Sequence, residues 1–121
     1  QEIYHTYRQA FADMPEIAMN PMNPDGEANN WLSCMTIAAG CGVTPDMVMD
    51  ALAAENIESR PIWKPMHLQP VFADCDFFAH AAPGSVSEDI FNRGLCLPSD
   101  IKNTKDDMDL IIATIRKVFG K

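Results

Sequence analysis

Basic residues are scarce in this 121-residue sequence: nine lysines and arginines stand against seventeen aspartates and glutamates, for a formal net charge of -8. A surface this acidic repels a phosphate backbone over most of its area, so we expect no nucleic-acid partner. Any anionic ligand must therefore be bound by a local group of cationic side chains.

Long apolar runs are also missing. No stretch approaches the roughly 18 to 20 apolar residues that a membrane-spanning helix needs, and no basic segment followed by an apolar one opens the chain. We therefore expect a soluble, cytoplasmic protein without a membrane partner. The first residue is not Met, and Ile3, Tyr7 and Phe11 already follow a helical spacing, which predicts a part of a longer polypeptide.

Motifs of metal sites and of self-contained active sites are absent. The four cysteines form no CxxC pair and no paired histidines accompany them, so we predict no metal site. Cys34, Cys41 and Cys96 stand among apolar or small residues, a pattern typical of reduced, buried thiols. GxSxG, HExxH, P-loop and GxGxxG motifs do not occur, so we predict no catalytic residue in this chain.

What is present predicts one compact domain. The length and the 47% hydrophobic content suffice for a real core. Apolar spacing and turn residues predict helices over about 1–13, 45–56, 86–93 and 105–118, and strands over about 15–21, 29–39, 57–63 and 94–98. This order favours an α+β fold, a small and mostly antiparallel sheet covered by helices, over a doubly wound parallel fold.

Cap residues mark several of these boundaries. Thr44 and Thr104 are expected N-caps, and Ser85 with Glu88 has the spacing of a capping box. Gly94 is expected to end its helix in the left-handed conformation. The segments 20–30 and 73–86 are expected to be mobile loops.

The stretch "SRPIWKPMHLQP", residues 59 to 70, departs most from the acidic background. It holds three prolines together with Arg60, Lys64 and His67, and it contains no carboxylate. Proline restricts the unfolded chain, so these side chains lose less entropy when a ligand binds. Arg60 can make two parallel hydrogen bonds to a phosphate, and Lys64 adds a positive charge. His67 can donate a hydrogen bond to a phosphate or sugar oxygen, and Trp63 can stack on a sugar.

Packing of this stretch against the sheet explains the same residues about as well as ligand binding does. Trp63, Met66, Leu68 and Phe72 could lie across the sheet edge, with the cations in solvent. Trp31, beside Asn30 in an apolar strand, is more typical of a core residue than of a binding residue. The residues alone leave both interpretations open.

Four blocks in order, "NNWLS", "NIESRPIWKPMHLQPVF", "EDIFNRGLCLPSD" and "TKDDMDLIIATIRKVF", resemble the C-terminal part of the DegT/DnrJ/EryC1/StrS family of sugar-nucleotide aminotransferases. The resemblance spans essentially the whole chain. It implies that residues 1–121 are the single C-terminal small domain of a fold-type I enzyme that uses pyridoxal 5'-phosphate (PLP). The family moves an amino group from glutamate to a keto-sugar nucleotide, here most similar to the branch acting on UDP-linked 4-keto sugars.

The resemblance also implies a homodimer with active sites between subunits, and a large N-terminal domain that holds the cofactor. No cofactor-binding residue can be assigned to this chain, and Lys64 does not match the cofactor-binding lysine. The fragment alone is therefore expected to be inactive and to bind no PLP.

For substrate binding, the resemblance implies His67 first, then Arg60 and Trp63 with Lys64 nearby, while Asn30 and Trp31 support the same wall. The alternatives are a family member without transamination, such as a dehydratase or a regulator, and a stand-alone carbohydrate- or protein-binding module.

Overall fold

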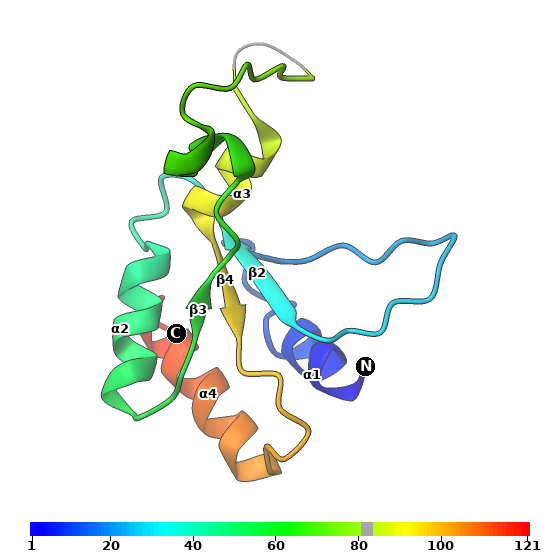
Figure 1. Ribbon diagram of the computed structural model, residues 1–121. Coiled ribbons are helices and arrows are strands. Elements are labelled where there is room, and N and C mark those ends of the chain that lie inside the picture. The colour runs from blue at the N-terminus through cyan, green and yellow to red at the C-terminus, as the bar shows by residue number, and fades with distance from the viewer. Residues whose placement is uncertain (81–83) are drawn as a thin grey trace.

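The computed structural model describes residues 1–80 and 84–121 (Figure 1). Along the chain the elements are α1 (Glu2–Ala10), β1 (Ile17–Met19), β2 (Ser33–Ile37), α2 (Pro45–Ala54), β3 (Arg60–Pro61), the short 3-10 helices η1 (Met66–Leu68) and η2 (Pro70–Phe72), α3 (Val86–Arg93), β4 (Gly94–Leu97) and α4 (Lys105–Val118). The expected order of α-helices and strands is confirmed, and η1 and η2 were not expected.

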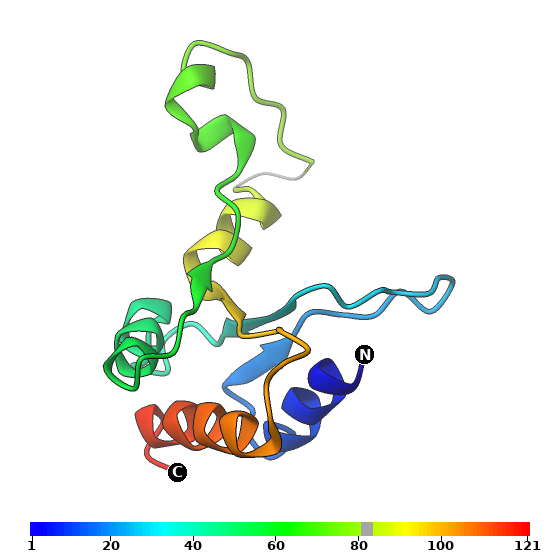
Figure 2. The same cartoon turned by 60° about the horizontal axis from the view of Figure 1, so that its bottom comes forward.

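Within the described residues the strands form one sheet in the order β1-β2-β4-β3, and every neighbouring pair is antiparallel. The α+β class with a small antiparallel sheet is therefore confirmed. Figure 2 shows α1, α2 and α4 on one side of this sheet. Met35 and Ile37 of β2 are buried in the core, whereas the alternate residues Cys34 and Thr36 are only half-buried.

The core is where α1, α2 and α4 meet the sheet. Side chains with no exposed surface include Tyr7 of α1, Leu52 of α2, Leu95 of β4 and Ile115 of α4. The Tyr7 hydroxyl donates a hydrogen bond to the carbonyl oxygen of Pro98 at 2.8 Å, which ties α1 to the segment after β4. Burial raises the pKa of Tyr7 well above its usual value, so this hydroxyl stays protonated.

Helices α2 and α4 begin at the cap residues that the sequence predicted. The Thr44 hydroxyl accepts from the backbone of Met47, and Thr104 with Asp107 forms a reciprocal capping box. At the other end of α2, Asn56 has a φ of 59° and the Ile57 amide donates to the Leu52 carbonyl. This cap uses Ile57, so the strand predicted from residue 57 begins only at residue 60.

Three sequence expectations fail locally. β2 begins at Ser33, so Trp31 precedes the strand and 71% of its surface is exposed; its expected place in the core is wrong. Gly94 is extended, with a φ of -114°, because α3 passes directly into β4; the left-handed cap is wrong. α1 ends at Ala10, before the expected Asp13, in a short turn.

Two segments project from the body of the molecule (Figures 1 and 2). We call residues 20–32, between β1 and β2, the hairpin loop, and residues 62–80 with 84–93, between β3 and β4, the arm. The expected mobile segment 73–86 belongs to the arm, and its residues 81–83 lie outside the described residues. Arg93 anchors the arm, because its guanidinium donates to the Ile37 carbonyl of β2 at 2.8 Å and pairs with Asp89.

The ion pair between Asp13 and Arg116 predicts a dependence of stability on acid pH. Two hydrogen bonds of 2.8 Å from the Arg116 guanidinium lower the pKa of Asp13 from 3.8 to about 2. The contribution of Asp13 is therefore present above pH 3.8 and is lost as the pH falls through about 2. In the Asp13→Asn variant, the unfolding midpoint should fall less between pH 3.8 and about 2 than it does in the wild type. An unchanged acid profile would contradict this.

Candidate functional site

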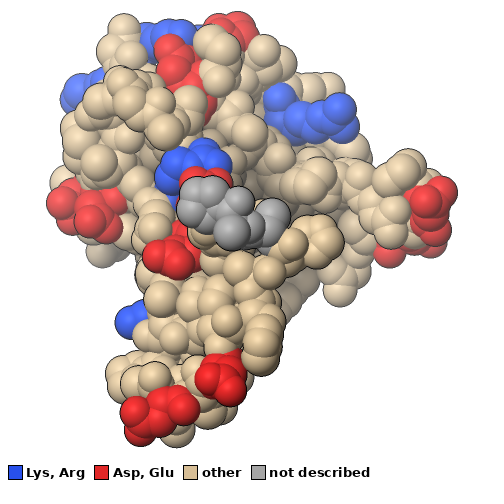
Figure 3. All heavy atoms as spheres, turned by 90° about the horizontal axis from the view of Figure 1, so that it is seen from above, with Lys and Arg blue, Asp and Glu red and all other residues tan. Residues whose placement is uncertain are grey.

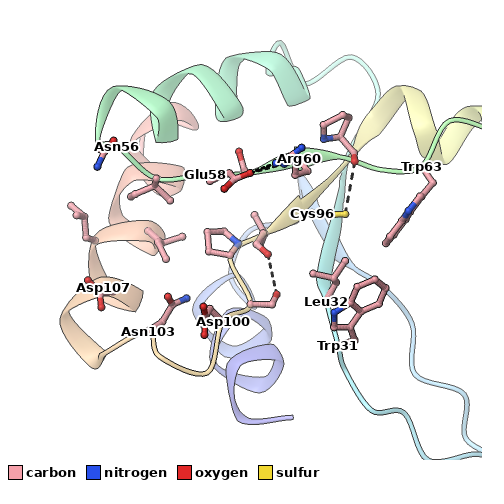
Figure 4. Close-up of a pocket in the computed structure, with 18 residues that line it drawn as sticks. Trp31, Leu32, Asn56, Glu58, Arg60, Trp63, Cys96, Asp100, Asn103 and Asp107 are labelled. Atoms are coloured by element: carbon pink, nitrogen blue, oxygen red, sulfur yellow. Dashed lines mark hydrogen bonds and ion pairs between the residues drawn. The ribbon is translucent and has the colours of Figure 1, made fainter.

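A cavity of about 860 Å³ opens at the β3 edge of the sheet, between the loop after α2, the end of β4 and the first turns of α4 (Figure 4). Trp31 and Trp63 lie on one side, and Asn103 and Asp107 of the α4 region lie opposite. We call this cavity the cleft. It is wide enough for a small ligand rather than for a single water molecule.

The two tryptophans give the cleft its aromatic side. Their ring centroids are 6.2 Å apart and their planes are tilted by 42°. Trp31 lies near the end of the hairpin loop and Trp63 near the start of the arm, so both protrusions meet at this point. Both indoles remain largely exposed, at 71% and 62%. Exposed indole faces of this kind are suited to stacking on a sugar or a planar ring.

Arg60 adds a cation to the same cleft. Its Nε donates to Glu58 Oε1 at 2.7 Å, and both side chains are mostly in solvent. An exposed ion pair of this kind contributes little to stability, so an incoming anion can replace Glu58 as the partner of the guanidinium.

His67 does not line the cleft. Its ring lies in the arm, stacked on Phe77 with centroids 3.8 Å apart, and its Nε2 is 3.6 Å from a carboxylate oxygen of Glu88. Only 15% of the side chain is exposed. Glu88 therefore combines two contacts, since its backbone amide donates to the Ser85 cap while its carboxylate faces His67.

Lys64 and Asn30 also lie outside the lining of the cleft. Lys64 is exposed on the arm, and its carbonyl accepts from the Gln69 side chain at 3.2 Å. Asn30 has a φ of 49°, and both polar atoms of its side chain are buried with no partner among the described residues. The structure thus gathers Trp31, Arg60 and Trp63, and it separates the other three predicted site residues from them.

The fold also corrects the local charge inferred from residues 59 to 70. The stretch itself has no carboxylate, yet Glu58 pairs with Arg60 and Glu88 faces His67. A count along the sequence missed both acids, because one lies just before the stretch and the other approaches from α3. Figure 3 shows Asp and Glu side chains near the far ends of both projections.

The prolines nevertheless order this stretch as expected. Pro65 precedes η1 and Pro70 begins η2, and successive backbone bonds join Leu68 to Pro65 and Phe72 to Gln69 at 3.0 and 2.9 Å. The arm does not lie across the sheet edge as packing alone predicted. It projects away, and Trp63 and Met66 stay exposed.

Sequence reasoning missed several residues of the cleft, namely Glu58, Asp100, Asn103, Asp107 and Cys96. Asp107 also belongs to the capping box of α4. Across residues 1–80 and 84–121, no three His, Cys, Asp or Glu side chains gather in an arrangement suited to a metal ion. In the same ranges, no helix has the length and apolarity needed to cross a bilayer.

Comparisons with known proteins connect this fold to one class of enzymes, the sugar aminotransferases. The profile of the DegT/DnrJ/EryC1/StrS aminotransferase family matches residues 1–116. EpsN of Bacillus subtilis (strain 168), named as a pyridoxal phosphate-dependent aminotransferase, is 38% identical over 117 residues, which are 97% of this chain and 30% of EpsN. GDP-perosamine synthase of Caulobacter vibrioides is 33% identical over 91 residues, 74% of this chain and 23% of that protein.

A solved structure agrees with the sequence matches. DesI, crystallised in the presence of its TDP-sugar product, superposes with a TM-score of 0.79 and 25% identity over 99% of this chain and 30% of DesI. This chain belongs to the DegT/DnrJ/EryC1/StrS aminotransferase family, as the four sequence blocks indicated. It spans less than a third of the length of each of these relatives.

The residues present do not form a PLP site by themselves. Such a site needs a lysine that binds the cofactor and an acid facing the pyridine nitrogen. Among the described residues that line the cleft there is no lysine, and Lys64 is exposed on the arm.

Proposed function

We propose that this chain is the C-terminal small domain of a PLP-dependent aminotransferase that transfers the amino group of glutamate to a keto-sugar nucleotide, with a UDP-linked 4-keto sugar as the preferred substrate. The observation that carries the proposal is the family match over residues 1–116 together with 38% identity to EpsN. The similarity to GDP-perosamine synthase, and to DesI crystallised in the presence of its TDP-sugar product, supports a nucleotide sugar as the substrate class.

In this proposal the large N-terminal domain, upstream of residue 1, holds PLP and carries the chemistry. The enzyme acts in the cytoplasm as a homodimer. The exposed apolar side chains of the arm support a protein partner for this segment, because monomers rarely expose so many close together. These side chains are Trp63, Met66, Val71, Phe77, Phe78, Val86 and Ile90.

The substrate contacts divide into two groups. Trp31, Trp63 and Arg60 form a wall with two indole faces and a guanidinium, which suits a sugar and a diphosphate. The arm carries Lys64 and His67 away from the sheet, toward a substrate held by other protein, and Phe77 with Glu88 fixes the orientation of the imidazole. Asn30 supports the wall from the hairpin loop.

The decisive experiment follows the nitrogen atom. The full-length protein is purified with PLP and incubated with a UDP-4-keto sugar and glutamate labelled with heavy nitrogen. We expect a labelled amino sugar nucleotide by mass spectrometry. A deoxygenated sugar without nitrogen would identify a dehydratase instead, and an unchanged nucleotide with the whole panel of UDP, GDP and TDP keto sugars would favour a regulator or a binding module.

Loss of His67 should separate substrate binding from cofactor binding. In the full-length protein, His67→Ala removes a hydrogen-bond donor to a charged substrate, worth about 1.5–3 kcal/mol. We expect kcat/KM for the sugar nucleotide to fall about 10- to 150-fold, while bound PLP, followed by its visible absorbance, stays stoichiometric.

His5→Ala is the matched control, because His5 is exposed on α1 away from the arm. It should leave both measurements unchanged. Unaltered kinetics in His67→Ala would mean that the imidazole only packs within the arm.

A further inference from the structure

Cys34 and Cys96 lie directly opposite each other on β2 and β4. The backbone amide of Cys34 donates to the Asn20 side chain, and its carbonyl accepts from the Asn20 amide, so both groups point away from β4. Cys34 and Cys96 are therefore a non-hydrogen-bonded pair of the antiparallel ladder. In such pairs the Cα atoms are only about 4.5 Å apart and the side chains approach most closely.

This position brings the two sulfur atoms together. The Sγ atoms are 3.5 Å apart in the thiol state. A disulfide needs a separation of about 2.05 Å and Cα atoms about 4.4–6.8 Å apart, and this pair falls at the short end of that range. Small side-chain rotations can close the gap without moving the strands.

One member of the pair lies in the wall of the cleft. Cys96 lines it, and Arg60 is the cross-strand neighbour of Cys96 on its other side. Cys34, Cys96 and Arg60 thus form one row across the open face of the sheet. Cys96 itself is buried and Cys34 is half-buried, so we expect a small reagent to reach the pair from the cleft or at Cys34.

We propose that Cys34 and Cys96 form a reversible dithiol–disulfide site beside the cleft, a modification site that is separate from the proposed transamination. The reaction partner is a two-electron thiol oxidant. Two S–H bonds break and one S–S bond forms, and the oxidant takes up both electrons and both protons. With diamide as the probe, its N=N bond is reduced to a hydrazine.

The structure holds the pair as two free thiols. Burial, and then the hydrogen bond with Cys96, raises the pKa of the Cys34 thiol, so less of it is thiolate and its oxidation is expected to be faster at alkaline pH.

The test is a mapping of disulfides in the full-length protein. Native protein is treated with diamide, remaining thiols are alkylated, and peptides are identified by mass spectrometry. We expect the Cys34–Cys96 cross-link as the dominant product, lighter by two hydrogen atoms, and its complete loss after dithiothreitol. Cys96→Ala should abolish it, whereas Cys75→Ala should leave it in place, since Cys75 is exposed on the arm.

Denatured wild-type protein provides a control that needs no variant. Cys34 and Cys96 are 62 residues apart, and loop closure favours shorter loops in an unfolded chain. Oxidation in denaturant should therefore favour Cys34 with Cys41, or Cys75 with Cys96. If the native protein gives the same pattern as the denatured one, or if Cys34 and Cys96 remain alkylated as free thiols, the proposal is wrong. Neither result depends on transaminase activity.

Discussion

Replacing Tyr7 by alanine is expected to lower the free energy of unfolding by about 3–5 kcal/mol, the range for removing a large aromatic side chain from a core. Tyr7 has no exposed surface, stacks on Phe11 with centroids 6.1 Å apart, and donates its hydroxyl hydrogen to Pro98. A domain of this size is stable by only about 5–15 kcal/mol, so the loss is a large fraction of the total. Urea unfolding followed by circular dichroism measures it.

Tyr7→Phe separates packing from hydrogen bonding. It keeps the ring but leaves the Pro98 carbonyl without its donor, which should cost about 1–3 kcal/mol. The expected order of stability is therefore wild type, then Tyr7→Phe, then Tyr7→Ala. If the two variants were equally stable, the ring would contribute nothing and the assignment of α1 to the core would be wrong.

Gly94→Ala is expected to disturb the junction between the arm and the sheet. A Cβ at this position would stand 2.6 Å from the carbonyl oxygen of Ile90 and closer still to the Cδ1 of Ile62. Ile62 can move its side chain, but the Ile90 carbonyl belongs to the backbone of α3. Overpacking of this kind costs about 1–3 kcal/mol. The thermal midpoint should fall.

Gly26→Ala is the matched control, because its Cβ would meet only Asn23 Nδ2 at 3.4 Å, an ordinary contact. It should be close to neutral. If Gly94→Ala were equally neutral, α3 would not pass as close to β4 as described, and the arm would be attached more loosely.

Most of the fold could be predicted because its signals are local. Thr44 and Thr104 cap their helices as expected, and Pro61 restricts its strand to the sheet edge. Gly94 was expected at the end of α3 and does lie there, but the reason given was wrong. This position requires glycine because Ile62 and Ile90 of the arm lie too close for a Cβ, and not because of a left-handed turn. Contacts between distant segments leave no periodic trace in a sequence.

The candidate site was predicted less completely for the same reason. Arg60 and Trp63 were found because they stand in one unusual stretch, and Trp31 was found only through the family resemblance. The sequence did not reveal that Glu88, from α3, faces His67. It also did not reveal that Cys34 meets Cys96, because only the strand register brings residues 62 positions apart into contact.

Both outer strands of the sheet are short and sit beside prolines. β3 consists of Arg60 and Pro61, and Pro61 has no amide hydrogen to offer a further strand. β1 has three residues between Pro15 and Pro21. Such blunted edges resist edge-to-edge aggregation. Pairing of two copies strand to strand, and amyloid-like growth from either margin of the sheet, are therefore disfavoured.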